Sequence, residues 1–292
     1  MNNHPILTTE DLTYIYQKGS KNEVPAIRDI SIEIMQGELV GIIGHTGSGK
    51  STLIEHFNAL KKGTSGRVLL DSEDIWADKS KIRSVRFRVG VCFQYPEYQL
   101  FEETVAKDIA FGPKNMGLQQ DEIDRRVSDA LSFVGLSNAY KDKSPFDLSG
   151  GEKRRVAIAG IMAMEPQVLV LDEPCAGLDP RGRETVLHMI ADYRAKTGCT
   201  VLLVSHSMED VAAIADRILV MNQARVAFFD TVEHVFSHAD ELKNMGLDIP
   251  QMTQLLLLLR QKGIDVPVNL YTVPQVYDML RTRLKGGNAN AE

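Results

Sequence analysis

The sequence predicts an α/β fold, in which helices cover a mostly parallel sheet, and two observations along the chain predict it. Up to about residue 225, short aliphatic runs alternate with longer amphipathic stretches, which is the pattern of strands followed by helices. Three runs are apolar at nearly every position, as strands buried on both faces are. They are Leu39 to Ile43, Val168 to Leu171 and Val201 to Val204.

A helical subdomain is predicted inside this α/β unit. Residues 95–165 contain no comparable aliphatic strand. Within them, DEIDRRVSDALSFVGL and GEKRRVAIAGIMAME have the periodicity of amphipathic helices. We therefore expect a helical insertion in an α/β domain that spans residues 1–228.

A small helical extension is predicted over residues 229–292. Pro250 opens one predicted helix, which Gly263 closes, and Thr272-Val-Pro274 opens another that reaches Lys285. Because about 60 residues bury little surface alone, we expect the apolar faces of these helices to contact a partner; a small self-contained core is the alternative. The apolar residues are the leucines 255–259, then Val276, Met279, Leu280 and Leu284.

Composition excludes several classes of protein. The 292 residues are 43% hydrophobic and 25% charged, as in a folded globular chain. The longest aliphatic run, the five leucines 255–259, is far shorter than the ~20 residues of a spanning helix, and the N-terminus does not resemble a secretory signal. Three cysteines without a CxxC pair indicate a reducing compartment, the cytoplasm, and the net charge of −6 argues against a nucleic-acid partner.

Residues 44–51, GHTGSGKS, are predicted to bind the phosphates of a nucleotide. They match G-x-x-x-x-G-K-[ST] and stand between a buried strand and the helical run STLIEHFNALKK. The glycines let backbone N–H groups face inward at a helix N-terminus, and Lys50 would reach the β- and γ-phosphates. The alternative, a glycine-rich turn with an incidental lysine, is disfavoured by the flanking elements. The predicted nucleotide-binding residues here are Gly44, His45, Thr46, Gly47, Ser48, Gly49, Lys50, Ser51 and Thr52.

Polar residues after the other buried strands are expected at the same edge of the sheet, because ligands of open α/β sheets bind beyond the carboxyl ends of the strands. Asp172 and Ser51 would hold Mg²⁺, directly or through water, and Glu173 would accept a proton from the attacking water. His206 could contact the γ-phosphate, and Gln94, after VGVCF, is placed to reach Mg²⁺ or the water. Taken alone, each would be an ordinary turn, cap or packing residue; their shared position favours function.

A second anion site is predicted at residues 148–152, LSGGE, which open the helix EKRRVAIAGIMAM. Ser149 is a plausible helix cap, while Gly150 and Gly151 leave N–H groups bare at a positive helix end. This site is about 100 residues from the first and on another subdomain. We therefore expect it to serve a nucleotide that another copy holds.

These motifs, in this order, resemble those of the ATP-binding cassette (ABC) ATPases over residues 4 to about 230. The resemblance implies binding of ATP with Mg²⁺, ATP hydrolysis, and a loop AGLD at 176–179 with Asp179. It also places Tyr16 where the family stacks an aromatic ring on adenine, with Tyr14 as the rival. Two departures are Glu152, where the family usually has glutamine, and Cys175, where serine or threonine is common; the glutamate would put a negative charge near the partner's nucleotide.

Within that family, FQYPEYQLFEETVAKDIAFGPKNMGL and SPFDLSGGEKRRVAIAGIMAMEPQVLVLDEP resemble the ATPases of energy-coupling factor transporters for vitamins and metal ions. GHTGSGKST with EYQLFEETV resembles the second of their two paralogous ATPases. The resemblance implies a head-to-tail dimer, usually with the related paralogue, peripheral at the cytoplasmic face of the membrane. Its partners would be a transmembrane coupling subunit, received by residues 94 to about 104, and an integral-membrane component that captures the substrate. The extension resembles the ATPase-to-ATPase contact domain.

Two other functions fit the sequence less well. Soluble ABC proteins that remodel ribosomes or DNA generally have two cassettes or a long coiled coil, whereas this chain has one cassette, no sustained heptads and an acidic balance. A generic P-loop GTPase would leave LSGGE unexplained, and no NKxD-type segment is present.

Overall fold

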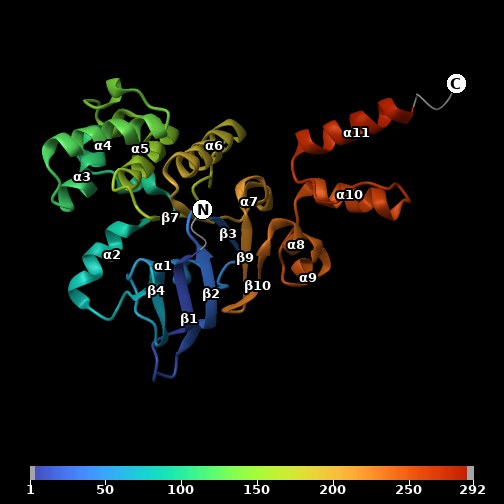
Figure 1. The fold of residues 1–292 in the computed structure, drawn as a ribbon, viewed down its shortest axis with the longest axis horizontal. Helices are drawn as coiled ribbons and strands as arrows, with labels where there is room; N and C mark the ends of the chain where they lie inside the picture. The colour runs from blue at the N-terminus through green and yellow to red at the C-terminus, as the bar shows by residue number, and fades with distance from the viewer. Residues whose placement is uncertain (1–3, 288–292) are drawn as a thin grey trace.

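The computed structural model describes residues 4–287, and a six-stranded sheet forms its centre (Figure 1). The strand order is β10-β9-β3-β8-β7-β6, and the pairs of β3, β6, β7, β8 and β9 are parallel, while β10 runs antiparallel to β9. The three predicted aliphatic strands are confirmed as neighbours, and their apolar residues are all buried. The strands are β3 (Leu39–Ile43), β6 (Val89–Cys92), β7 (Val168–Asp172), β8 (Thr200–Val204), β9 (Arg217–Asn222) and β10 (Arg225–Thr231).

A second sheet, antiparallel and four-stranded, was not predicted. Its order is β2-β1-β4-β5, with β1 (Pro5–Tyr16), β2 (Val24–Met35), β4 (Ser65–Leu70) and β5 (Glu73–Asp74). In β2, buried Ile30, Ile32 and Ile34 alternate with exposed residues, as in a strand with one solvated face. The buried residues of this sheet and of α1 (Lys50–Phe57) form one apolar core with Val40 and Ile42 of β3, so the two sheets hold the start of α1 between them.

The predicted helical subdomain is confirmed. It consists of α3 (Val105–Asn115), α4 (Gln120–Phe133) and α5 (Gly150–Met162), which contact one another and lie together at one side of Figure 1. The buried faces of α4 and α5 share a core with Leu169 and Leu171 of β7. Packing against β7 therefore fixes the start of α5, where LSGGE lies, relative to the central sheet.

Four helices follow β10 in the described chain, two more than predicted: α8 (Val232–Ser237), α9 (Ala239–Asn244), α10 (Gln251–Gln261) and α11 (Val273–Gly287). The boundary expected at residue 228 falls within β10, which belongs to the central sheet. Pro250 precedes α10, and Gly263 follows it with φ +82°. The α10 and α11 pair extends from the side of the molecule opposite α3 to α5 (Figure 1). Residues 288–292 and the side chain of Leu284 lie outside the described part.

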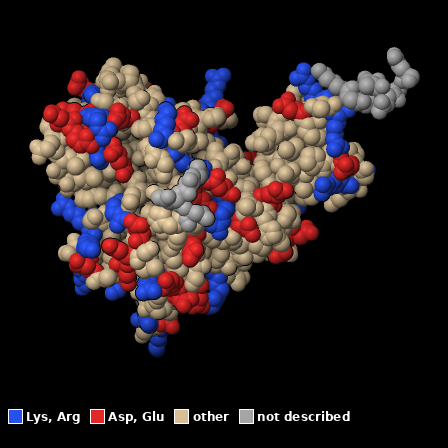
Figure 2. Space-filling model, viewed as in Figure 1, with Lys and Arg blue, Asp and Glu red and all other residues tan. Residues whose placement is uncertain are grey.

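The remaining helices cover the central sheet or connect its strands. They are α2 (Ile82–Arg88), α6 (Pro180–Thr197), α7 (Met208–Ile214) and short 3₁₀ turns, of which η2 (Pro96–Gln99) is used below. Among residues 4–287, no helix combines the length and the apolar character that crossing a bilayer requires. On the face shown in Figure 2, basic and acidic side chains are interspersed.

Candidate functional site

A pocket of about 370 Å³ lies where β3, β7 and β8 end. The three polar clusters expected at one edge of the sheet all contribute to it, together with the aromatic residue on β1. Of the predicted residues, the pocket is lined by Tyr16, Thr46, Gly47, Gly49, Lys50, Ser51, Thr52, Gln94, Asp172, Glu173 and His206. Gly44, His45 and Ser48 are not lining residues, and Ser48 is fully buried beneath the loop.

The loop between β3 and α1 has a backbone that requires glycine at two positions. Gly44 has φ +156° and Gly49 has φ +107°, values that side chains with a Cβ rarely adopt. A Cβ on Gly44 would lie 2.4 Å from the carbonyl oxygen of Met221, and one on Gly49 would lie 2.3 Å from that of Ala26. The loop is therefore held in its curled form by backbone from both sheets.

Lys50 begins α1 and is almost completely buried. Its Nζ donates hydrogen bonds to the carbonyl oxygens of Gly44, at 2.6 Å, and His45, at 3.2 Å. Burial lowers the pKa of Lys50, and the nearby carboxylates of Glu173 and Asp172 oppose that shift. The ammonium group therefore lies under the loop, close enough to the carboxylates of Glu173 and Asp172 for their charges to act on it.

Asp172, at the end of β7, faces the first turn of α1. The Ser51 hydroxyl donates to its Oδ2 at 3.4 Å. Burial raises the pKa of Asp172. The Ser51 hydrogen bond and the charge of Lys50 lower it, but by less than burial raises it. Ser51, Asp172 and the Gln94 amide offer oxygen atoms within one pocket, the donor set that Mg²⁺ prefers, so these residues fit a magnesium ion.

Glu173 follows Asp172 in the left-handed conformation, with φ 53°. Its side chain is 12% exposed, and its Oε1 is buried without a hydrogen-bond partner in the described structure. His206 Nε2 is 3.4 Å from Oε1, close enough for an ion pair but not aligned for a hydrogen bond. Burial raises the pKa of Glu173 to about 7, and burial together with the charge of Lys50 lowers the pKa of His206.

The structure favours Tyr16 over Tyr14 as the pocket's aromatic residue. Tyr16 lines the pocket, and its hydroxyl is bonded by Lys61 Nζ at 2.6 Å and lies 3.2 Å from Thr52 Oγ1. Tyr14 instead packs edge-on against His56 and joins the core between the two sheets.

Several residues at this end of the pocket were not predicted from the sequence. Val24, Pro25 and Ala26 line it, because antiparallel pairing of β1 with β2 sets Val24 opposite Tyr16. Recognising the alternating pattern of β2 as the second strand of a hairpin would have found them. Lys61 had no sequence signal.

The signature segment is not part of this pocket. Ser149 caps α5: its hydroxyl accepts from the N–H of Glu152 at 3.4 Å, and the Glu152 carboxylate accepts from the Ser149 N–H at 2.9 Å. The same carboxylate accepts from the Ser149 hydroxyl and from the Tyr140 hydroxyl, both at 2.6 Å, and these bonds lower the pKa of Glu152 to about 2. A Cβ on Gly150 or Gly151 would meet no atom within 4 Å, so both glycines face open space.

Asp179 of the AGLD loop has a local structural contact. It caps α6, and its Oδ1 accepts from the N–H of Gly182 at 2.8 Å. Cys175, the other departure from the family pattern, is buried, and its side chain joins the core shared by α5 and β7.

A second hollow, of about 380 Å³, lies between η2 and the helices α3 and α5. Pro96, Gln99, Leu100 and Phe101 line it from the segment expected to receive a membrane protein. Phe101 is exposed and packs edge-on against Phe111 of α3, which is also exposed. The hollow therefore offers an apolar surface with aromatic rings at its rim.

Comparison with known proteins adds a family to this geometry. Residues 27–176 match the ABC transporter family. The chain is 51% identical over 267 residues to the energy-coupling factor transporter ATP-binding protein EcfA2 of Clostridium tetani, covering 91% of this chain and 93% of that one. CbiO1 of Clostridium perfringens, described as part of the ABC transporter complex CbiONQ, is 36% identical, with TM-score 0.75 over 88% of this chain and 99% of that one. A dimeric ATP-binding cassette bound to ADP and phosphate after hydrolysis is 25% identical, with TM-score 0.69 over 77% and 98%.

Proposed function

The chain belongs to the energy-coupling factor transporter ATP-binding proteins of the ABC transporter family, and we propose from this premise that it supplies half of each of two composite ATP sites. It is the ATP-hydrolysing subunit of such a transporter. The observation that carries the proposal is the separation of the two glycine-rich segments: the phosphate loop lines a pocket, whereas Gly150 and Gly151 face open space outside it.

The ATP phosphates would lie against the loop 44–51, with Lys50 on the β- and γ-phosphates. Tyr16 would stack on adenine, its ring oriented by Lys61. Ser51, Asp172 and Gln94 would hold Mg²⁺, which when bound neutralises charge on the phosphates. His45 and Ser48 would shape the loop rather than contact ATP, because neither lines the pocket.

Glu173 is proposed as the general base. Its side chain lines the pocket, and its buried Oε1 has no hydrogen-bond partner among the described residues, so the carboxylate would be free to accept a proton from the attacking water. His206, 3.4 Å from Oε1, would contact the γ-phosphate from the other side. Gln94 would orient the same water or the metal.

A second ATPase would complete each site. Its nucleotide would meet Ser149, Gly150 and Gly151 at the positive end of α5, and Asp179 would lie at the contact between the two chains. The Glu152 carboxylate, bonded inward to Ser149 and Tyr140, would shape the signature turn. Solved dimeric relatives support this assembly, and the paralogous ATPase of the family is the proposed second subunit.

The membrane partners follow from the same family likeness. The hollow lined by Pro96, Leu100 and Phe101 would receive a helix of the transmembrane coupling subunit, and a separate integral-membrane component would capture a vitamin or other micronutrient. The chain would therefore be peripheral at the cytoplasmic face. Closure of the two ATPases on ATP would drive the coupling helices together.

The extension over residues 229–292 is proposed as a contact between the ATPases. Large apolar side chains on it are exposed, and much of its surface in Figure 2 carries no charge. A small core of Leu256, Val266 and Val276 holds α10 and α11 together. The exposed side chains are Leu255, Leu258, Ile264, Val273 and Tyr277.

Capture of the tagged chain from detergent-solubilised membranes tests the proposal. We expect a second ATPase and integral-membrane proteins to co-purify, with ATP hydrolysis that depends on Mg²⁺. Recovery of the chain only with ribosomes or nucleoid would instead support the other function considered, a soluble remodelling ATPase.

A further inference from the structure

Arg154 joins three functional segments through one buried side chain. It lies on α5, five residues after Ser149, and its side chain is 5% exposed. Its guanidinium contacts Glu97 of η2 on one side and the chain that follows Glu173 on the other. The motifs of the nucleotide site do not include either Arg154 or Glu97.

The contact with Glu97 is bidentate. Arg154 Nε donates to Oε2 at 3.0 Å, and one terminal nitrogen donates to Oε1 at 2.6 Å. Glu97 is 14% exposed; burial would raise its pKa, but the hydrogen bonding and charge of Arg154, together with a backbone hydrogen bond, outweigh burial, and the pKa lies below its usual value. Such a fork-to-carboxylate pair fixes direction as well as distance. Glu97 lies in the turn whose Pro96 and Gln99 line the proposed docking hollow.

The other terminal nitrogen donates to two backbone carbonyls, those of Pro174 at 3.3 Å and Ala176 at 2.5 Å. Pro174 directly follows Glu173, and Ala176 is the first residue of the AGLD loop. A displacement of η2 that kept the bidentate pair would therefore pull on the backbone next to the proposed base. Breaking the pair would leave a buried charge unmatched, which is costly.

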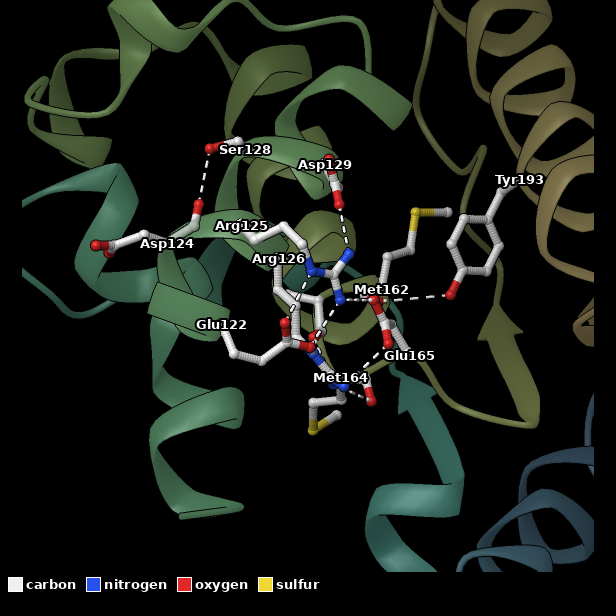
Figure 3. A network of polar contacts seen from close by, with 11 residues as sticks. Glu122, Asp124, Arg125, Arg126, Ser128, Asp129, Met162, Met164, Glu165 and Tyr193 are labelled. Atoms are coloured by element: carbon white, nitrogen blue, oxygen red, sulfur yellow. Dashed lines mark hydrogen bonds and ion pairs between the residues drawn. The ribbon is translucent and has the colours of Figure 1, made fainter. Parts of the chain in front are cut away.

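Arg126 of α4, which contacts the chain at the C-terminal end of α5, offers a matched comparison (Figure 3). Its side chain is 12% exposed, and it also combines carboxylates with two carbonyls. Its partners are Glu122 on its own helix α4, Glu165, and the carbonyls of Ala163 and Met164 at the end of α5. None of these partners lines the nucleotide pocket, so Arg126 fastens the subdomain without touching the site.

We propose that Arg154 is a positioning residue that couples occupation of the hollow beside η2 to the placement of the chain after Glu173. The inference rests on the proposed function, because the occupant is the coupling subunit of the transporter. Arginine is required: lysine has one point charge and cannot hold a carboxylate with two parallel bonds while also bonding two carbonyls. Through Arg154, binding of the membrane subunit would change the affinity for ATP. ATP binding must then change the affinity for the membrane subunit by the same factor.

The test compares the ATP affinity of the paired ATPases in two states, without the membrane subunits and in the purified membrane complex, with Glu173→Gln present in this chain throughout to prevent turnover. In the parent, we expect the two dissociation constants to differ by at least about fivefold. Arg154→Lys should reduce that ratio to within about twofold while leaving the affinity of the ATPase pair without membrane subunits unchanged. Arg126→Lys should lower the unfolding temperature and keep the parent ratio.

A second variant guards against misfolding of the first. Glu97→Gln removes the charge pair but keeps the shape and the two carbonyl bonds, and it should collapse the ratio in the same way. A parent ratio near one, or an unchanged ratio in either Arg154→Lys or Glu97→Gln, would overturn the inference. If the chain carrying only Glu173→Gln co-purifies with no membrane protein, the proposed function itself fails, which is a different result.

Discussion

The two surfaces proposed to bind anions, the phosphate loop and the signature turn, differ in what surrounds their glycines. In the phosphate loop, a Cβ on Gly44 or Gly49 would collide with backbone carbonyls at 2.4 and 2.3 Å. In the signature turn, a Cβ on Gly150 or Gly151 would meet nothing within 4 Å. The first surface is thus shaped by its own chain, and the second is left free for something outside the chain.

The helices behind the two surfaces differ in the same sense. Helix α1 follows Gly49 with no side-chain cap, so no capping side chain covers the free N–H groups of its first turn. Helix α5 begins with a complete capping box from Ser149 and Glu152. A helix capped by its own residues keeps its form without a ligand. This suits the proposed role of the signature turn, which would contact a nucleotide only when two ATPases come together.

The largest effect is expected at the pocket's own chemistry. Glu173→Gln keeps the size of the side chain but removes the proton acceptor, so turnover by the assembled complex should fall by about 10² to 10⁴-fold while ATP-dependent closure persists. Steady-state phosphate release and size-exclusion measurements check this. Glu184→Gln, at an exposed position on α6, is the control and should hydrolyse ATP normally; a fast Glu173→Gln variant would remove Glu173 as the base.

Substitution of a phosphate-loop glycine should damage the chain by itself. Gly49→Ala would force a Cβ against the Ala26 carbonyl at positive φ, so we expect a loss of about 2 kcal/mol or more in stability and at least tenfold weaker ATP binding. Urea unfolding and calorimetric titration of the full chain measure both. Unchanged values would show that the loop is not shaped as described.

The signature glycine should behave in the opposite way. Gly151→Asp has room for its Cβ, so stability and ATP affinity of the chain alone should stay close to wild type. In the assembled complex, the added carboxylate would face phosphates and should lower turnover by about tenfold or more. Gly151→Ala, smaller and uncharged, should reduce turnover less; equal loss in both variants would contradict an electrostatic cause.

A smaller change is expected at the adenine end. Tyr16→Ala removes the ring from the pocket and should weaken ATP binding by about 2- to 10-fold, the range for an aromatic contact of about 0.5–1.5 kcal/mol. Tyr16→Phe keeps the ring and should stay near wild type, although it loses the Lys61 contact. Should Tyr14→Ala alone weaken binding with stability unchanged, the assignment would pass to Tyr14.

The smallest expected effect concerns the cap of α5. Hydrogen bonds from Ser149 and Tyr140 lower the pKa of Glu152 to about 2, from a usual value of 4.5. The ionised group therefore contributes stability above about pH 4.5, and that contribution is lost as pH falls toward 2. Because the group is partly exposed to solvent, Glu152→Gln should cost less than about 1 kcal/mol at pH 7. The difference between variant and wild type, from urea midpoints, should shrink in acid; a difference that grows would refute the capping role.

Much of the central fold could be predicted because its signals are local. β3, β7 and β8 are apolar at successive positions, and the phosphate loop is a continuous motif between a strand and a helix. α4 carries a clear helical period, with Ile123, Val127, Ala130 and Leu131 buried. The residues expected at one sheet edge do line one pocket, because parallel strands end on the same side.

The remainder depends on contacts between distant segments. The second sheet depends on the pairing of β2 with β1. The alternating apolar residues of β2 are a weaker sequence signal than the continuous apolar runs of the central strands. The inward direction of the Glu152 carboxylate depends on Tyr140, 12 residues earlier, and the Arg154 pair joins residues 57 apart. Helices α8 and α9 have six residues each, too few for a periodic pattern, so only α10 and α11, each near a proline, gave a signal.

The central claim is that the chain holds half of each catalytic centre, and the ATPase rate with and without the second subunit tests it most directly. Initial rates would be measured for the monomeric chain and for the complex, each in wild type and Gly151→Asp. We expect the monomer to be at least tenfold slower than the complex and indifferent to the substitution, with the complex strongly impaired by it. A monomer that hydrolyses ATP at the rate of the complex, with Gly151→Asp harmless in both, would contradict the account.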